Sequence, residues 1–396
     1  MWASENGSQD IETGAAALIR GILRGYIDGR MTGYLHWPLV AAITPNLPFS
    51  TVGLAVAPSP WSGFYRLGKQ TWALAHVSQF AQPGWRFIDS ASGYLGGNRL
   101  NGSFVTLKSP NGTDYSTIIE TGSATATHTV NLTVSSGLSA GPVSVWTTNL
   151  NSTNPADYFV RQPDITPSNG RYTLTLQPGR IYTLTTTSGQ GKGTATSPAR
   201  HDLTLPYNDT FDSYPVNAEA RYVADMQGSF EVRDCTAGHT GRCLQQVAPV
   251  QPILWQGGSD AFTLAGDPAW RDYTVSVDVN LQQSGVVKLI GRANTQARPQ
   301  TKQASYEFRV SDTGTWTIAK RDTAATVTSL TSGTVSALGL NRWHTLALDL
   351  HGGTITGRID GTTVGSAQDS SFASGQVGLG MVGYQTDQFD NLTITP

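Results

Sequence analysis

The sequence predicts a mainly β protein in which a short α/β segment precedes two all-β domains. Charged residues make up only 14% of the chain, which contains 43 Gly and 10 Trp, a composition that favours strands and tight turns over long helices. Helical periodicity is confined to about the first 80 residues, and alternation of apolar and polar residues follows it. With 396 residues, the chain is long enough for two or three domains.

Residues 1–82 have the rhythm of an α/β unit. Between residues 11 and 28 apolar side chains recur at the i, i+3, i+4 spacing of a helix with one buried face. We expect a buried strand over residues 31–37, ending at Pro38, and a second helix from Lys69 to Phe80. Alternation of strands and helices is typical of parallel α/β structure.

Residues 83–190 are predicted to form a β-sandwich, because alternating segments follow one another between turn signals. The expected strands are 103–108, 115–121, 127–134, 143–149 and 172–187, the last broken at Pro178-Gly179. The Gly-, Ser- and Thr-rich stretch that follows has little to bury, so we place a linker at residues 191–204.

Residues 205–396 alternate again and have the length of one antiparallel jelly roll. The expected strands are 229–233, 273–281, 285–293, 306–310, 316–320, 343–350, 354–359 and 377–382.

Charge and hydropathy exclude two classes of partner. Lys and Arg number 26 against 28 Asp and Glu, a net charge of -2, and no basic run is present, so nucleic acid is not an expected partner. No apolar run reaches membrane-spanning length. Neither a basic nor an apolar region follows Met1, so these residues are not expected to be a signal peptide.

The two cysteines, Cys235 and Cys243, lie in a polar, Gly-containing loop. Their short spacing predicts a disulfide, and the alternative is a pair of unlinked small side chains.

Three residue types suggest sites or core positions. Glu5 closes the short segment Trp2-Ala-Ser-Glu5 before the first helix; on pattern alone, a solvated surface charge is the simpler interpretation. Trp37 could offer a flat apolar face to a sugar, or it could pack in a core with Leu35 and Leu39. The histidines His36 and His76 are expected to be structural.

Several motifs resemble the galactocerebrosidase (galactosylceramidase) family of retaining glycoside hydrolases. The longest is the run from Thr71 to Trp85, TWALAHVSQFAQPGW, preceded by PWSGFY from Pro60. The opening WASE, YLHW ending at Trp37, and the closing QFDN from Gln388 are also similar to that family.

The resemblance implies a (β/α)8 barrel, of which residues 1–82 match only the last part, then a β-sandwich and a C-terminal lectin-like, concanavalin-like jelly roll. It implies that Glu5 is the catalytic nucleophile. The substrate-binding positions that it implies are Ser8, Trp37, Phe49, where the family usually has Tyr, and Trp255. The family also holds a calcium ion in the jelly roll, for which Asp209, Asp212 and Asp390 match.

Two departures limit these expectations. The family's general acid/base lies in a Trp-Asn-Glu context that does not occur in this chain. A substrate-contacting Arg usually follows the Ile-Ile-Glu-Thr strand, but the residues after Thr121 contain none before His128. A β-galactoside is therefore a safer expectation than galactosylceramide itself.

Two functions remain open at this point. The first is a β-galactosidase of the galactosylceramidase type, acting on a β-galactoside or glycolipid, secreted or lysosome-like by family habit and inactive as this chain because it lacks the acid/base Glu. The alternative is a non-catalytic, lectin-like carbohydrate-binding module. The first function requires no cofactor for catalysis.

Overall fold

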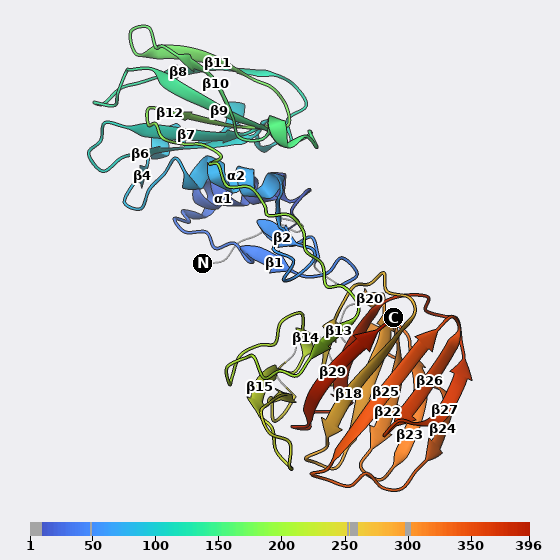
Figure 1. Cartoon of the computed structure of the whole chain (residues 1–396). Helices are drawn as coiled ribbons and strands as arrows, with labels where there is room; N and C mark the ends of the chain where they lie inside the picture. Colours follow the sequence, from blue (N-terminus) through green and yellow to red (C-terminus); the bar gives the residue numbers. More distant parts are fainter. Residues whose placement is uncertain (1–9, 48–49, 252, 254–259, 298–301) are drawn as a thin grey trace. The chain divides into compact units, whose positions relative to one another are not determined.

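The computed structural model describes residues 10–47, 50–251, 253, 260–297 and 302–396. The chain forms two compact units (Figure 1). The first contains most residues up to Pro198, and the second contains Ala199–Pro396 together with the segments Ile43–Ser50 and Ser59–Phe64.

Both helices belong to the first unit: α1 spans Ala15–Gly29 and α2 spans Lys69–Ser78. The sequence predicts the first helix from residue 11, but residues 11–14 form turns. The Oδ1 atom of Asp10 accepts hydrogen bonds from the backbone N–H groups of Glu12 and Thr13, which fixes this turn before the helix begins.

A small sheet lies between the helices in the sequence. Its strands are β1 (Val40–Ala42), β2 (Ala55–Ala57) and β3 (Arg66–Leu67), with β1 parallel and β3 antiparallel to β2. The predicted strand over residues 31–37 is wrong, because those residues pair with no neighbour. Pro38 has no N–H to donate to a neighbouring strand. Its carbonyl accepts from the N–H of Leu54, and this is the first backbone hydrogen bond towards β2.

The sandwich is built on a seven-stranded antiparallel sheet in the order β10-β9-β12-β7-β6-β4, with β5 also pairing with β6. Its strands are β4 (Arg86–Phe87), β5 (Gly93–Tyr94), β6 (Ser103–Lys108), β7 (Tyr115–Glu120), β9 (Val143–Asn149), β10 (Val160–Ile165) and β12 (Arg180–Thr185). A separate antiparallel pair is formed by β8 (His128–Thr133) and β11 (Arg171–Leu176). The expected break at Pro178-Gly179 is confirmed, since it separates β11 from β12.

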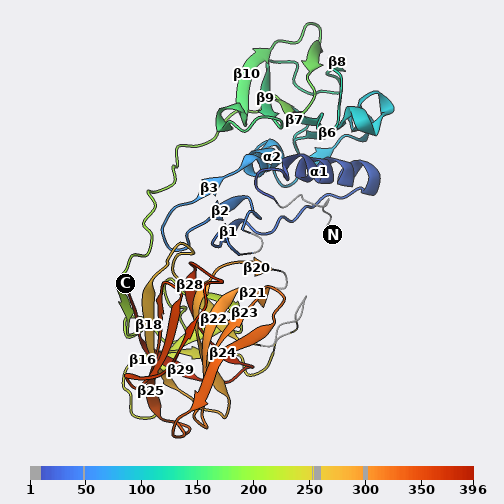
Figure 2. The ribbon, with the colours of Figure 1, turned by 90° about the vertical axis from the view of Figure 1, so that its right-hand side faces the viewer.

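The seven-stranded sheet is covered on both faces (Figure 2). Ile19 and Leu23 of α1 pack with Val105 and Ile118 on one face. On the other face the β8–β11 pair contributes to a second core, which contains Tyr115, Ile119, Tyr172, Leu176, Tyr182 and Leu184. Alternation along β6 and β7 therefore supplies two cores, not one core and one solvated face.

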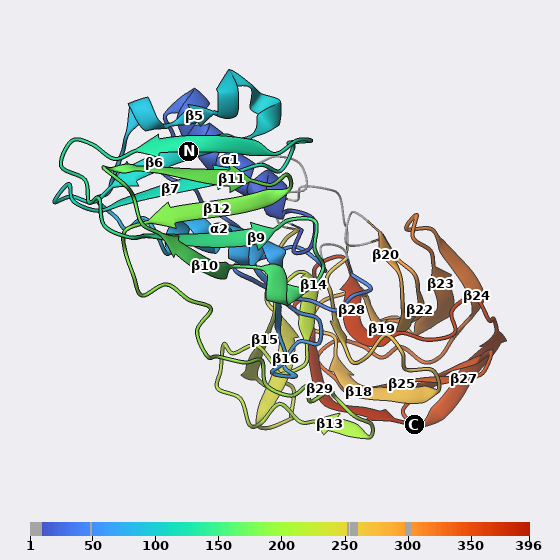
Figure 3. The same ribbon diagram turned by 90° about the horizontal axis from the view of Figure 1, so that it is seen from above.

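The second unit is a two-sheet jelly roll, whose sheets appear as separate layers in Figure 3. One sheet has the order β15-β16-β29-β18-β25-β26-β27, with β13 also pairing with β29, and the other has the order β14-β17-β28-β19-β22-β23-β24. The first contains β13 (Tyr207–Asp209), β15 (Phe230–Asp234), β16 (Arg242–Gln246), β18 (Tyr273–Asn280), β25 (Trp343–His351), β26 (Thr354–Ile359), β27 (Thr362–Gln368) and β29 (Gln388–Thr395). The second contains β14 (Ala224–Gln227), β17 (Phe262–Ala265), β19 (Val286–Ala293), β22 (Ser305–Ser311), β23 (Thr315–Arg321), β24 (Val327–Thr334) and β28 (Gln376–Val382). A short pair, β20 (Gln296–Ala297) and β21 (Lys302–Gln303), completes the unit.

The core of the jelly roll lies between these sheets and includes Val275, Val277, Leu289, Phe308 and Leu348. A smaller apolar cluster joins Ile43 and Leu47 to Phe262, Leu264, Ile290 and Ala293. Asn46 anchors the same segment by donating to the carbonyl of Asn294. A piece of chain from the α/β region is thus part of the jelly-roll unit.

In the part of the chain that the structure describes, no helix combines the length and apolarity needed to cross a lipid bilayer.

Candidate functional site

Four predicted site residues, Glu5, Ser8, Phe49 and Trp255, lie outside the described residues. The structure does describe the chain from Asp10 onward, the predicted aromatic platform Trp37 and the predicted metal ligands.

The chain after Glu5 is held by close backbone contacts at Ile11. The N–H of Ile11 donates to the carbonyl of Thr51 over 2.7 Å, and the carbonyl of Ile11 accepts from Gln70. Ile11 is fully buried, and a Cβ atom at Gly68 would lie only 2.1 Å from its Cγ1. Only glycine permits this approach, so Gly68 helps to fix the segment that leads away from Glu5.

The two acids closest to Glu5 in the sequence, Asp10 and Glu12, are engaged elsewhere. Burial would raise the pKa of Asp10, but hydrogen bonds from Thr13 and Thr51 outweigh it and lower the pKa below its usual value. Glu12 forms an ion pair with Arg66. A general acid must hold a proton near neutral pH, which the lowered pKa of Asp10 opposes, and the carboxylate of Glu12 is occupied by Arg66.

Trp37 is not a core residue, since 70% of its surface is exposed. Leu35 and Leu39, two positions away on either side, are 73% and 70% exposed. All three side chains are thus largely open to solvent, and the indole is accessible to a ligand. An exposed indole face suits the C–H face of a sugar, whereas the core-packing alternative does not describe this residue.

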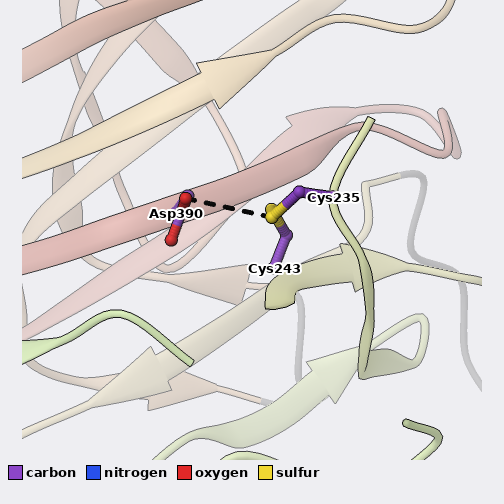
Figure 4. A group of neighbouring side chains, drawn as sticks. All are labelled: Cys235, Cys243 and Asp390. Carbon is purple, nitrogen blue, oxygen red and sulfur yellow. Dashed lines mark hydrogen bonds between the residues drawn. A yellow bond between two sulfur atoms is a disulfide. The ribbon is translucent and has the colours of Figure 1, made fainter. Parts of the chain in front are cut away.

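The predicted disulfide between Cys235 and Cys243 is confirmed, with the two Cα atoms 5.2 Å apart. Asp390 of β29 lies beside it (Figure 4), with Oδ2 3.9 Å from the Sγ of Cys235. A disulfide sulfur carries no proton and is not a thiolate, so this is a packing contact and the sulfurs are not metal ligands.

We expect replacement of both cysteines by alanine to lower the stability of the jelly roll by roughly 2–3 kcal/mol, because the unfolded chain gains the freedom of the opened loop. Urea unfolding with and without reductant measures this, and reductant should shift the midpoint of the native protein but not that of the double variant. An equal shift in both proteins would contradict the prediction.

Of the three predicted calcium ligands, Asp209 already accepts three hydrogen bonds. Its Oδ2 accepts hydrogen bonds from the hydroxyl groups of Tyr207 and Tyr214, and its Oδ1 accepts from the N–H of Phe211. A carboxylate offers about four lone pairs, so these three donors leave room for a metal ion, and the assignment of Asp209 as a calcium ligand stays a prediction.

The other two predicted ligands, Asp212 and Asp390, form an acidic pair. Burial raises the pKa of Asp390, and the charge of Asp212 raises it further, while His239 lowers it. The Nδ1 atom of His239 lies 3.0 Å from Oδ2 of Asp390, and its ring stacks on Trp343 with centroids 4.0 Å apart. The disulfide loop therefore brings a histidine and an acid together, which the sequence spacing did not indicate.

The sequence also gave no sign of a buried charge network in the second sheet. Its five members are Asp260, Lys288, Glu307, Arg309 and Arg321. The Nε of Arg321 lies 2.8 Å from Glu307, and its Nη2 lies 2.9 Å from Asp260. The side chain of Glu307 is fully buried, so these charges stabilise one another away from water.

Comparison with known proteins agrees with this architecture. The family model "Glycosyl hydrolase family 59" matches residues 1–79, and the model "Galactocerebrosidase, C-terminal lectin domain" matches residues 225–396. Galactocerebrosidase from Canis lupus familiaris is 29% identical over 423 residues, and that from Salmo salar is 28% identical over 421. Both alignments cover 100% of this chain but only 62% of the relative's length.

A solved structure, carbohydrate-binding module CBM66 from Bacillus subtilis, matches 44% of this chain and 96% of its own at 20% identity, with a TM-score of 0.35. The mainly β fold class with a C-terminal lectin domain is thus confirmed by the family match. The chain is a member of a glycoside hydrolase family. Specifically, it belongs to the galactocerebrosidase family.

Proposed function

We propose that this chain serves the retaining hydrolysis of a β-galactoside, with Glu5 as the nucleophile. The glycosyl hydrolase match over residues 1–79, which contains both Glu5 and the exposed Trp37, is the observation that carries the proposal. The substrate is a galactosylceramide or a related glycolipid, and the setting is secreted or lysosome-like, as the family resemblance suggests.

The chemistry of retention requires two carboxyl groups. One attacks the anomeric carbon and forms a galactosyl ester, while the other protonates the leaving oxygen and then activates water. The sequence contains no Trp-Asn-Glu, and Asp10 and Glu12 are held by hydrogen bonds and an ion pair. We therefore propose that the 396-residue chain supplies the nucleophile and does not turn over by itself.

A structural calcium ion belongs to the same proposal. Asp209, Asp212 and Asp390 would supply its carboxylate oxygens. The ion would offset the mutual repulsion that contributes to the raised pKa of Asp390.

A galactoside with a very good leaving group tests the nucleophile, because 2,4-dinitrophenolate departs without protonation. We expect the 396-residue chain to release at most about one equivalent of dinitrophenolate and then stop, since no base activates water. Azide, which needs no base, should restart release and yield galactosyl azide of retained configuration. An aryl galactoside with a poor leaving group should not react.

Two variants provide the controls. Glu5→Gln should abolish both the burst and the azide product, while Trp37→Ala should raise the substrate concentration for half-maximal burst about tenfold through loss of the sugar platform. Leu35→Ala, at an equally exposed apolar position, should leave that concentration nearly unchanged. Sustained turnover of an alkyl galactoside by the unmodified chain would contradict the proposal.

The alternative is a non-catalytic carbohydrate-binding module, favoured by the lectin-domain match over residues 225–396. In that case no burst would occur with any leaving group, and galactoside binding would survive Glu5→Gln unchanged.

A further inference from the structure

Two connections at one end of the jelly roll carry polar side chains that contact a third connection, residues 282–285, between β18 and β19. Asp387 and Gln385 lie between β28 and β29, and Asp312 follows β22 directly. None of these residues belongs to the proposed galactoside site or to the Asp212–Asp390 pair.

Each of the three side chains contacts the connection formed by residues 282–285. The Oδ1 atom of Asp387 accepts from the N–H of Gln282 over 2.8 Å. The Oδ1 atom of Asp312 accepts from the N–H of Gly285 over 3.1 Å, and its Oδ2 accepts from the hydroxyl group of Ser284. A Cβ atom at Gly285 would lie 2.5 Å from Nε2 of Gln385, so that amide lies directly against the same connection.

Two acceptor oxygens at this place are left over. Asp387 is fully buried, yet its Oδ2 has no hydrogen-bond donor among the described residues. The buried Oε1 of Gln385 likewise has none there, although its Nε2 donates to the carbonyl of Val382. A buried carboxylate oxygen without a partner is costly, because it has lost water and gained nothing in exchange.

The electrostatic environment of Asp387 also disfavours its charged form. Burial raises the pKa of Asp387 to about 6 against the effect of the Gln282 and Gln283 amides, and the charge of Asp312 raises it further. Within the described chain no basic side chain contributes to this shift. Two acids and an amide oxygen at one place, without a cation, are a ligand set of hard oxygens.

We propose that Asp387, Asp312 and the amide oxygen of Gln385 bind a calcium ion at the connection between β18 and β19. Calcium accepts carboxylate, amide and water oxygens in flexible geometry, whereas magnesium demands a nearly ideal octahedron. The ion satisfies the two unpartnered oxygens and ties the three connections together.

Calcium binding to the EDTA-treated full chain tests the site, by equilibrium dialysis and by thermal unfolding with calcium alone. Calcium should raise Tm, and magnesium at the same concentration should raise it less. Asp387→Asn keeps an acceptor for the Gln282 N–H but removes the charge, so it should remove one bound equivalent or weaken it at least tenfold. Asp312→Asn, at a less buried position, should change binding in the same direction even if the first variant folds poorly.

Two controls separate this site from others. Asp322→Asn alters an exposed acid that likewise accepts backbone N–H groups, those of Ala324 and Thr326, and should leave calcium binding unchanged. Asp390→Asn should leave the Asp387 equivalent intact, whatever happens at the disulfide. Calcium binding that is absent from the native chain, or unchanged in both Asp387→Asn and Asp312→Asn, would overturn the proposal.

Discussion

Replacing Glu307 by glutamine is expected to lower the stability of the jelly-roll unit by about 3–5 kcal/mol, the usual cost of breaking a buried ion pair. Glu307 is fully buried and contacts Arg321, Arg309 and Lys288, at 2.8, 2.5 and 3.8 Å. With a neutral side chain at this position, Lys288 and Arg321 keep only Asp260 as a carboxylate partner in the network, and Arg309 loses its ion pair with Glu307.

The same residue predicts acid sensitivity. Burial alone would raise the pKa of Glu307, but Lys288, Arg309 and Arg321 lower it from 4.5 to about 2. Because the folded-state pKa is the lower one, the network stabilises the fold above about pH 4.5 and loses this contribution as the pH falls towards 2. Glu307→Gln should flatten the dependence of stability on pH in that window.

Urea titration with pulsed hydrogen exchange resolves this unit from the other, since peptides of β19, β22 and β23 report on it directly. Glu231→Gln, in the more exposed pair with Arg233, is the matched control and should change the stability by less than about 1 kcal/mol. Equal effects of the two substitutions would show that the network contributes no more than a surface pair.

The second large effect is expected at His76 of α2. Both ring nitrogens lie 2.8 Å from hydroxyl groups, Nδ1 from Thr183 and Nε2 from Thr148. The ring also packs against Phe80 and Phe159. His76→Ala should destabilise the sandwich unit by about 3–4 kcal/mol, because it leaves a cavity and removes one buried hydrogen bond from each of two hydroxyl groups.

Burial lowers the pKa of His76 from 6.5 to about 3. Between these values the unfolded chain binds a proton that the folded chain excludes, so stability falls as the pH falls, by about 1.4 kcal/mol per pH unit. His76→Gln should remove this slope in addition to its cost at pH 7.

Pulsed exchange of β9 and β12 peptides after urea equilibration at pH 7, 6 and 5 measures both effects. His128→Gln, on β8 of the same unit, should change the stability at pH 7 by less than about 0.5 kcal/mol. A native pH slope that persists in His76→Gln would assign the acid sensitivity to another group.

The sequence predicted many of the strands that have a buried face, but not all of them. Strands β6, β7, β9 and β26 coincide with their predictions within a residue, because apolar side chains occupy their inward positions and turn residues end them. It missed the buried strands β16, β17 and β29. It also missed β10, β24 and β27, which carry mostly exposed polar or small side chains along their length. Exposed strands of this kind form because they hydrogen-bond to a neighbouring strand, and the hydropathy pattern of the sequence does not reveal that pairing.

By itself the sequence determined the mainly β class, the disulfide, the structural role of His76 and the resemblance that assigns Glu5 and Trp37. Only the tertiary structure showed that Trp37 is exposed and that Asp209 is bound by two tyrosines. It alone brought Lys288, Glu307 and Arg321 together from β19, β22 and β23, and Asp387 to Asp312. Strand register and loop packing decide which of these side chains come into contact, and both depend on residues that are distant in the sequence. Hydrophobic periodicity and short spacings carry only local information.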